Sequence, residues 1–265
     1  MIHAGFVQYH VHFGDWDANA RAAEAGIRAC EGADLLVLPE LAFSGYDFLD
    51  RDEVRSLAED PASGPTATML RELAAALNVT LVAGYAEAAA GGCCNSAMLV
   101  TPQGAVHNYR KLHLFNREKE LFLPGDGVPP VFETPAGRIG VMICFDWFFP
   151  ETARCLALKG AQIVAHPSNL VLPWCQQAMF ARSVENHVFS ITANRIGTED
   201  RAGRSLTFTG GSQLLDCSGQ CLARAALDAP AQAIVALDPA EADNKVIAGT
   251  NHLFEERRPA MYDAL

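Results

Sequence analysis

Residues 140–151 read Gly-Val-Met-Ile-Cys-Phe-Asp-Trp-Phe-Phe-Pro-Glu, and within them an apolar run typical of a buried strand leads into the start of a helix. Pro150 suits the first helical position, because proline lacks the N–H group that a helix start leaves unpaired. Cys144 is therefore predicted to lie on a sharp strand-to-helix connection, where free backbone N–H groups favour a thiolate and can stabilise an oxyanion. The alternative is a buried structural cysteine, the commoner fate of this residue in an apolar strand.

On both sides of this stretch, short apolar runs alternate with helix-like segments, a pattern that indicates an α/β fold. The number of strands favours two sheets packed face to face with helices outside. No internal repeat, low-complexity tract or Pro/Gly/Ser-rich linker interrupts the chain, so we interpret residues 1–265 as a single domain. Strands are expected at residues 2–9, 35–38, 80–85, 97–100, 106–110, 131–133, 139–143, 163–166, 189–193, 212–215, 221–226 and 233–237, and helices at residues 17–30, 66–77, 150–159 and 174–186.

The composition restricts the class of protein and its partners. Half of the 265 residues are apolar, which predicts a sizeable core, and the formal net charge of −11 argues against nucleic acid or an anionic membrane surface as the main partner. We find neither a signal peptide nor a run of ~20 apolar residues that could span a bilayer, so we expect a soluble, cytoplasmic protein. The eight cysteines include no Cys-x-x-Cys pair, so we expect mostly buried free thiols and no structural zinc.

Two further polar residues follow predicted strands. Glu40 ends the run Leu-Leu-Val-Leu-Pro-Glu at residues 35–40, and ligands of open α/β sheets gather at the carboxyl ends of the strands. A helix-capping or turn carboxylate is the alternative for Glu40. Lys111 follows the strand at 106–110 and precedes the apolar residues 112–115, which indicates that the chain returns to the interior there. A solvated surface lysine is the alternative for Lys111.

Together these three residues supply a nucleophile, a base and a fixed cation. A free cysteine has a pKa of about 8.5, so near neutrality its thiol needs a base to ionise it. The carboxylate of Glu40 can take the thiol proton, and the ammonium of Lys111 can stabilise both the thiolate and a tetrahedral oxyanion. Catalysis by a cysteine–histidine pair fits less well, because nothing in the sequence pairs a histidine with Cys144; His113 and His166 are candidates for supporting positions.

These segments resemble the signature of the nitrilase, or carbon–nitrogen hydrolase, superfamily. The resemblance extends through most of the chain and follows one order, with each of the three polar residues at a strand end. The matching segments are Leu38-Pro39-Glu40-Leu41 with Gly45-Tyr46, Tyr109 to Phe115, Phe122 to Gly125, Gly140 to Asp146 with Phe149-Pro150-Glu151, His166 to Asn169, Arg182 with Glu185-Asn186, Ala193-Asn194-Arg195 with Gly197, and Gly14-Asp15 with Asn19.

The resemblance implies a four-layer αββα sandwich that forms a homodimer or a larger homo-oligomer, without a cofactor or a metal ion. It implies that Glu40 is the general base and Cys144 the nucleophile. Lys111 then stabilises the oxyanion together with the backbone N–H of Phe145. The family also places a second glutamate a few residues after the lysine, and Glu118 is the matching position.

The second-glutamate assignment has two alternatives in the sequence. Glu120 lies close enough to take the place of Glu118, and Glu118 could instead be an exposed carboxylate at a helix start. In the family this second glutamate orients the lysine or the substrate and assists proton transfer. The positions of Glu118 and Glu120 relative to Lys111 therefore test the assignment.

The implied reaction splits an amide or nitrile through a thioester on the cysteine and releases ammonia and a carboxylic acid. The short chain and the triplet Cys144-Phe145-Asp146, where strict nitrilases tend to carry Cys-Trp-Glu, resemble the amidase and carbamoylase side of the family. We therefore expect a small carboxamide or N-carbamoyl compound as the substrate. An aliphatic nitrile is the alternative, because some short members with a similar Cys-Phe-Asp-Trp segment look like aliphatic nitrilases.

A partly aromatic pocket is expected around the nucleophile, because several large side chains lie just beyond the three polar residues or their neighbouring strands. With few positive groups, such a pocket suits a small neutral or apolar acyl group. A core or dimer-interface role is the alternative for two of these residues, Phe115 and Trp174. The expected substrate-binding residues are Tyr46, Phe115, Phe145, Trp147, Asn169 and Trp174.

Two hypotheses from other classes compete with this interpretation. His10 and His12 could form a metal-dependent amidohydrolase site with Glu40 or Asp15, although the remaining ligands are not apparent. A binding or scaffold protein that kept the fold but lost catalysis is the other hypothesis, and the complete Glu–Lys–Cys set argues against it.

Overall fold

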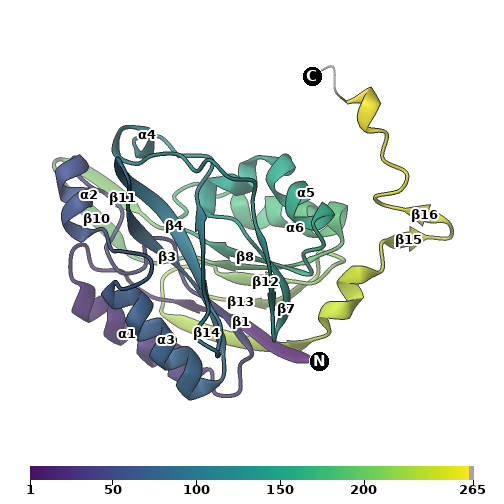
Figure 1. Cartoon of the computed structure of the whole chain (residues 1–265), viewed down its shortest axis with the longest axis horizontal. Helices are drawn as coiled ribbons and strands as arrows, with labels where there is room; N and C mark the ends of the chain where they lie inside the picture. Colours follow the sequence, from purple (N-terminus) through teal and green to yellow (C-terminus); the bar gives the residue numbers. More distant parts are fainter. Residues whose placement is uncertain (263–265) are drawn as a thin grey trace.

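Two six-stranded sheets form the centre of the protein in a computed structural model that describes residues 1–262 (Figure 1). The first sheet has the strand order β14-β1-β2-β3-β4-β5 and the second has the order β13-β12-β9-β8-β7-β6. The strands of the first sheet are β1 (Ile2–Gln8), β2 (Leu35–Val37), β3 (Thr80–Ala89), β4 (Gly92–Val100), β5 (Val106–Arg110) and β14 (Ala231–Leu237). Those of the second are β6 (Val131–Thr134), β7 (Gly137–Val141), β8 (Ile163–Pro167), β9 (Phe189–Ala193), β12 (Gln213–Leu215) and β13 (Cys221–Arg224).

Helices cover the outer face of each sheet. Helices α1 (Trp16–Ala29) and α3 (Pro65–Leu77) pack on the first sheet, where Ala23, Ile27 and Leu70 join side chains of β1, β2 and β3 in one apolar cluster. Helices α5 (Pro150–Leu158) and α6 (Cys175–Asn186) pack on the second sheet (Figure 1). Another apolar cluster joins the inner faces of both sheets and continues to α5 and α6. The predicted four-layer αββα sandwich is confirmed.

Each sheet contains three parallel strands with antiparallel strands beside them. Strands β1, β2 and β3 run parallel in the first sheet, and β7, β8 and β9 run parallel in the second. Parallel strands are buried on both faces, which explains why β2 and β8 are continuous apolar runs in the sequence. Two of the three predicted site residues, Glu40 and Cys144, follow the parallel strands β2 and β7, whereas Lys111 follows the antiparallel strand β5.

The sequence prediction misses one long hairpin. Strands β3 and β4 pair over nine residues each, from Leu81–Val100 to Ala89–Gly92, whereas the prediction ends the first strand at Tyr85 and begins the second at Ala97. The missing residues are rich in alanine and glycine, which have low strand propensity, so tertiary pairing overrides the local preference. The extended part of β4 carries Asn95.

Several shorter elements were also not predicted. They are α2 (Arg51–Leu57), α4 (Glu118–Leu121), the hairpin of β10 (Thr198–Arg201) and β11 (Arg204–Thr207), the 3-10 helices η1 (Cys144–Phe148), η2 (Pro239–Asp243) and η3 (Pro259–Met261), and the pair β15 (Val246–Ala248) and β16 (Asn251–His252). The segment from β15 to η3 extends away from the sandwich (Figure 1). None of the described helices is long and apolar enough to cross a membrane. All eight cysteines are free, and six of them are buried.

Candidate active site

Glu40 lies just past the end of β2, on a segment that continues along β3 without being part of the strand. Backbone hydrogen bonds from Leu38 to Val82 (2.8 Å) and from Gly84 to Pro39 (2.9 Å) hold this segment against β3. A side chain at position 84 would collide with it, because a Cβ there would lie 2.4 Å from the Cα of Glu40. Gly84 therefore allows the backbone of Glu40 to approach the sheet and turn its carboxylate inward.

The carboxylate of Glu40 is completely buried and only one of its oxygens is paired. Oε1 accepts hydrogen bonds from Lys111 Nζ (2.6 Å) and from Asn95 Nδ2 (2.7 Å). Oε2 is buried and has no hydrogen-bond partner among the described residues. A buried acceptor without a partner is costly, so Oε2 is the atom of this carboxylate that is available to a proton or a substrate donor.

Lys111 directly follows β5, and its ammonium lies between two carboxylates. Nζ is 2.6 Å from Glu40 Oε1 and 2.9 and 2.8 Å from the two oxygens of Glu118, while the side chain is fully buried. Burial alone would lower the pKa of Lys111, but the carboxylates of Glu118 and Glu40 outweigh burial and hold the pKa above its ordinary value. The ammonium is therefore a permanent positive charge.

Glu118 begins the short helix α4 and is 3% exposed. Its Oε1 accepts from Tyr46 Oη (2.6 Å), and its Oε2 accepts from the backbone N–H of Phe115 (3.1 Å). Burial and the neighbouring Glu40 raise the pKa of Glu118, and Lys111 opposes them. The side chain of Glu120, the alternative considered for this position, is 73% exposed and lies 3.9 Å from Arg117 instead.

Cys144 occupies a strained backbone position at the start of η1. Its φ of +40° lies in the left-handed region, which is unfavourable for a residue with a Cβ, and such strain often occurs at functional sites. Burial raises the pKa of the Cys144 thiol well above its ordinary value, Glu40 raises it further, and Lys111 lowers it. The resting residue is thus a neutral thiol, and it needs a base at the moment of attack.

Two buried side chains hold the backbone around Cys144. His166 in β8 donates from Nε2 to the carbonyl oxygen of Cys144 (2.9 Å) and accepts at Nδ1 from Thr192 Oγ1 (3.0 Å). This tautomer follows from the network, because a carbonyl can only accept. Burial lowers the pKa of His166 to about 4, so the ring is neutral and serves as a structural donor.

Asp146 fixes the other side of the connection. Its Oδ2 accepts from Tyr109 Oη (2.8 Å) and from the backbone N–H of Ile143 (2.9 Å), and its Oδ1 contacts His113 Nδ1 at 2.8 Å. These contacts tie η1 to β5 and to the segment after Lys111. Asp146 thereby holds the strands that carry the cysteine and the lysine at a fixed separation.

Two cavities adjoin this cluster, and they share Phe115 and Val171. The thiol cavity is small and is lined by Cys144 with Phe115, Phe145, Trp147, Asn169 and Val171, among others. The outer cavity contains Tyr46, Glu118, Arg117 and Arg204 in its wall. Of the expected substrate-binding residues, Phe115, Phe145, Trp147 and Asn169 therefore lie beside the thiol, and Tyr46 lies beside Glu118.

Trp174, an expected pocket residue, lies apart from both cavities, and its exposure agrees with the dimer-interface role given as its alternative. Trp174 precedes α6, is 54% exposed and is not in the wall of either cavity. Its position is decided by the segment 170–174, which leaves the thiol cavity before it reaches α6. In Asn169, by contrast, both amide atoms are buried and have no hydrogen-bond partner among the described residues.

The metal-site hypothesis does not agree with the positions of its residues. The rings of His10 and His12 lie against each other, with centroids 4.5 Å apart, and Glu40 is engaged by Lys111 and Asn95. Among residues 1–262, no three His, Cys, Asp or Glu side chains are grouped so that they could hold a metal ion.

Sequence reasoning missed the partner that orients Glu40. Asn95 is fully buried in β4 and leaves Oδ1 without a hydrogen-bond partner in the described part of the chain. The signal that could have located it was weak, because Asn95 lies in the Gly-Gly-Cys-Cys-Asn stretch that does not resemble a strand. Asp146 was visible in the sequence as part of the cysteine motif, but its hydrogen bonds across η1 were not.

An αββα sandwich in which a thiol, an ammonium and two carboxylates share one buried cluster defines a hydrolase with a cysteine nucleophile. Comparisons with known proteins agree with this class. A family profile described as carbon-nitrogen hydrolase matches residues 4–244. The chain belongs to this carbon–nitrogen hydrolase family, within the nitrilase superfamily.

Individual relatives carry both nitrilase and amidase names. A nitrilase from Pyrococcus abyssi is 41% identical over 264 residues, which cover 99% of each chain. An (R)-stereoselective amidase from Pseudomonas sp. is 36% identical over 219 residues, which cover 81% of this chain and 77% of that protein. Among solved structures, a variant of the amidase from Nesterenkonia sp. AN1 with acrylamide added at the active-site cysteine aligns with a TM-score of 0.80 at 26% identity, covering 100% and 99% of the two chains.

Proposed function

We propose that this protein hydrolyses a small carboxamide or N-carbamoyl compound to an acid and ammonia through a thioester on Cys144. The observation that carries the proposal is the unpaired oxygen of Glu40, buried in the same cluster as the neutral thiol and the permanent ammonium of Lys111. A thiol with a raised pKa requires a base, and Oε2 of Glu40 is a buried acceptor without a partner.

In the first half of the reaction, Glu40 takes the thiol proton while the sulfur of Cys144 attacks the amide carbon. The negative oxygen of the tetrahedral intermediate is stabilised by Lys111 and by the backbone N–H of Phe145 at the start of η1. Glu40 then returns the proton to the amide nitrogen, the carbon–nitrogen bond breaks and ammonia leaves. The acyl group remains on sulfur as a thioester.

In the second half, Glu40 takes a proton from water, and the resulting hydroxide attacks the thioester carbon. The same two donors stabilise the second oxyanion. When this intermediate collapses, the carbon–sulfur bond breaks, the acid is released and the sulfur recovers the proton held by Glu40. Glu118 binds the ammonium of Lys111 together with Glu40, so the ammonium keeps its position through both halves.

The composition of the thiol cavity supports a small acyl group of largely apolar character. Six of its eight lining residues have apolar side chains, Asn169 contributes an amide, and the thiol of Cys144 completes the wall; the six are Phe115, Phe145, Trp147, Leu170, Val171 and Leu172. A carboxamide brings N–H donors to acceptors that lack partners, such as Oε2 of Glu40, whereas a nitrile brings none. A site with unpaired buried acceptors discriminates against a substrate without donors.

A nitrile is the second candidate substrate, because the 41% identical relative from Pyrococcus abyssi is named a nitrilase. The same residues would act, but the thiol would first add to the nitrile carbon to give a thioimidate, which water converts to the thioester. The two candidate reactions therefore share the hydrolysis of the thioester and differ in the group that the thiol attacks first, an amide or a nitrile.

A paired screen tests this proposal. Purified protein is given matched aliphatic carboxamides, N-carbamoyl compounds and nitriles, and the release of ammonia is measured. We expect turnover of carboxamides or N-carbamoyl compounds, and an acyl adduct on the Cys144 peptide in mass spectra of quenched reactions. Ammonia release from nitriles alone would replace the proposal with its alternative, and turnover without any adduct on Cys144 would contradict both.

We also propose that the chain is a single hydrolase domain that works as a cytoplasmic homodimer or larger homo-oligomer. Exposed apolar side chains on α5 and α6, including Leu158, Phe180 and Val184, support an interface on the second-sheet side. Light scattering during size-exclusion chromatography measures the oligomeric state, and a monomer at micromolar concentration would contradict this proposal.

A further inference from the structure

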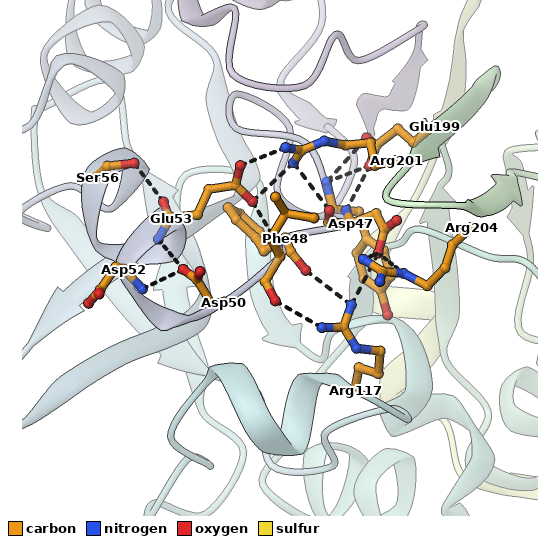
Figure 2. A network of polar contacts seen from close by, with 12 residues as sticks. Asp47, Phe48, Asp50, Asp52, Glu53, Ser56, Arg117, Glu199, Arg201 and Arg204 are labelled. Atoms are coloured by element: carbon orange, nitrogen blue, oxygen red, sulfur yellow. Dashed lines mark hydrogen bonds and ion pairs between the residues drawn. The ribbon is translucent and has the colours of Figure 1, made fainter.

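A buried carboxylate outside the cluster of Glu40, Lys111, Glu118 and Cys144 binds the loop that carries Tyr46. Glu199 in β10 is 5% exposed, and its oxygens accept from the backbone N–H of Tyr46 (3.2 Å to each oxygen) and of Asp47 (2.7 Å). The approach is close because residue 45 is a glycine with a φ of +87°, and a Cβ there would lie 3.1 Å from Oε1 of Glu199 and 2.7 Å from the Phe13 ring. Figure 2 shows Glu199 beside Asp47.

The other partner of Glu199 makes this anchor rigid. Arg195 is completely buried and donates from Nη1 to Oε1 of Glu199 (2.5 Å) and from Nη2 to the carbonyl oxygen of Val11. Its guanidinium lies 4.0 Å from the ring centroid of Phe208, which in turn contacts the Tyr46 ring edge to face at 5.9 Å. The pair therefore fixes both the backbone and the ring of Tyr46.

From Tyr46, an unbroken series of hydrogen bonds leads to the base. Tyr46 Oη donates to Glu118 (2.6 Å), both Glu118 oxygens contact Lys111 Nζ (2.9 and 2.8 Å), and Lys111 Nζ donates to Glu40 (2.6 Å). Each of these side chains is at most slightly exposed apart from Tyr46, which lies in the wall of the outer cavity.

We propose that Glu199 is a positioning residue for this hydrolase, acting through the Tyr46 hydroxyl to hold Glu118 and Lys111 at their working separation from Cys144. The proposal rests on the proposed function, because it gives Glu199 a purpose in that reaction. The physical reason is geometric: displacement of a catalytic group by about 1 Å can cost roughly 100-fold in rate.

The test is a double-mutant cycle on Glu199→Gln and Tyr46→Phe. Glutamine keeps the shape of Glu199 but cannot accept with both oxygens, so the Tyr46–Asp47 turn loses one anchor. We expect each single variant to lower kcat roughly 10- to 100-fold with KM changed less than about twofold. In the Tyr46→Phe background, we expect Glu199→Gln to lower kcat by less than about a further twofold, because both substitutions interrupt the same series of contacts. If the loss of kcat in the double variant equals the product of the two single losses, the proposal is overturned.

A matched control comes from the same surface. Glu53 accepts from Arg201 at 2.6 Å and lies in the network of Figure 2, but it contacts neither Tyr46 nor the catalytic cluster. Glu53→Gln should leave kcat within about twofold, in line with the small worth of a partly exposed ion pair. A loss as large as that of Glu199→Gln would show that general loosening of the loop, and not positioning by Glu199, lowers the rate.

Glu199→Gln leaves Arg195 buried without its full partner, which could prevent folding. Glu199→Asp keeps the charge beside Arg195 but is one methylene too short to retain both backbone N–H contacts. If Glu199→Gln does not fold, Glu199→Asp takes its place in the cycle with the same expected pattern. Wild-type kcat in folded Glu199→Asp would overturn the proposal.

A readout that needs no substrate separates this proposal from the proposed function. Iodoacetamide alkylates the Cys144 thiolate, whose population depends on the position of Lys111, and mass spectrometry of the Cys144 peptide measures the rate. We expect Glu199→Gln and Tyr46→Phe to slow alkylation at pH 7.5 at least about threefold, and Glu53→Gln to leave it unchanged. Unchanged alkylation in both variants would overturn the positioning role, whereas a wild type that hydrolyses none of the screened compounds would contradict the proposed function alone.

Discussion

Two clusters of charged side chains contribute residues to the wall of the outer cavity, and they differ in burial. The inner cluster joins Glu40, Lys111 and Glu118, which are between 0 and 3% exposed. The outer cluster, shown in Figure 2, contains Asp47, Glu53, Arg117, Arg201 and Arg204, and most of its side chains are between 21 and 35% exposed. Both contain contacts of about 2.6 to 3.1 Å, so distance does not separate them.

What separates the two clusters is the balance of charge and hydrogen-bonding partners. The inner cluster has two carboxylates for one ammonium, and among residues 1–262 one oxygen of Glu40 has no hydrogen-bond partner. Burial and, to a smaller extent, the negative charge of Glu40 raise the pKa of both Cys144 and Glu118. In the outer cluster, arginines bind carboxylates and backbone carbonyl oxygens near water, where ion pairs contribute little to stability. The comparison indicates that the inner cluster serves chemistry and the outer one holds loops together.

The largest expected effect is the loss of the thiol. We expect Cys144→Ala to lower kcat by at least ~10⁴-fold, because covalent catalysis loses its nucleophile, while the free energy of unfolding stays within about 1 kcal/mol of wild type. Ammonia release and urea denaturation measure the two quantities. Cys155→Ala, which removes a partly exposed thiol of α5, is the control and should keep full activity. Turnover by folded Cys144→Ala would contradict the mechanism.

The next effect distinguishes two buried lysines. Lys111→Met should reduce kcat by ~10²–10³-fold, because an oxyanion donor is lost. It should also lower the free energy of unfolding by ~3–5 kcal/mol, because two buried carboxylates lose their cation. Lys245 is the matched control: its Nζ binds the carbonyl oxygens of Asn186 (3.0 Å) and His187 (2.8 Å) at the end of α6.

Lys245→Met should therefore destabilise the protein without a comparable loss of kcat. Equal losses of kcat in the two lysine variants would remove the distinction between a catalytic and a structural buried cation. Initial rates and denaturant unfolding, measured on the same preparations, decide between these outcomes.

A third effect concerns pH and the stability of the connection around Cys144. His166 has a pKa of about 4 when folded, against about 6.5 for an unfolded histidine, so between these values the unfolded chain binds a proton that the folded protein does not. The resulting stability is fully present above pH 6.5 and is lost as the pH falls towards 4. We expect a contribution of about 3 kcal/mol at pH 7.5.

Urea unfolding of wild type and His166→Asn from pH 7.5 to pH 4.5 measures this contribution as a difference. Other groups titrate in the same range, and the comparison with His166→Asn cancels them. A difference that does not shrink as the pH falls would show that the neutral ring of His166 is not the cause.

The smallest effect is expected in the outer cluster. Arg201→Gln removes an ion pair with Glu53 whose members are 21 and 22% exposed, so we expect a loss of about 0.5–1 kcal/mol and a change in kcat below about twofold. The loss should shrink further in 0.5 M salt, because screening weakens exposed pairs. Denaturant unfolding at two salt concentrations measures this loss in the free energy of unfolding. A salt-independent loss above ~3 kcal/mol would contradict the prediction, because it is the size expected for a buried pair such as those of the inner cluster.

The fold was largely predictable because its local patterns agree with its tertiary structure. The apolar runs at β2 and β8 and the helix start at Pro150 lie where the sequence predicts them. The hairpin of β3 and β4 was predicted too short, because alanine and glycine give no strand signal of their own. The sequence does not indicate that Trp174 lies apart from both cavities, because aromatic character does not say in which direction the chain leaves the thiol cavity.

The sequence by itself determined most strands of the two six-stranded sheets, the four long helices and the three polar residues that follow buried strands, because these depend on the spacing of apolar residues along a local segment. Only the tertiary structure decided which oxygen of Glu40 stays unpaired, that Tyr46 binds Glu118 from 72 positions away, and that Glu199 binds the Tyr46 backbone across 153 positions. Such contacts depend on how distant segments meet, and hydrogen bonding is directional, so no local pattern records them.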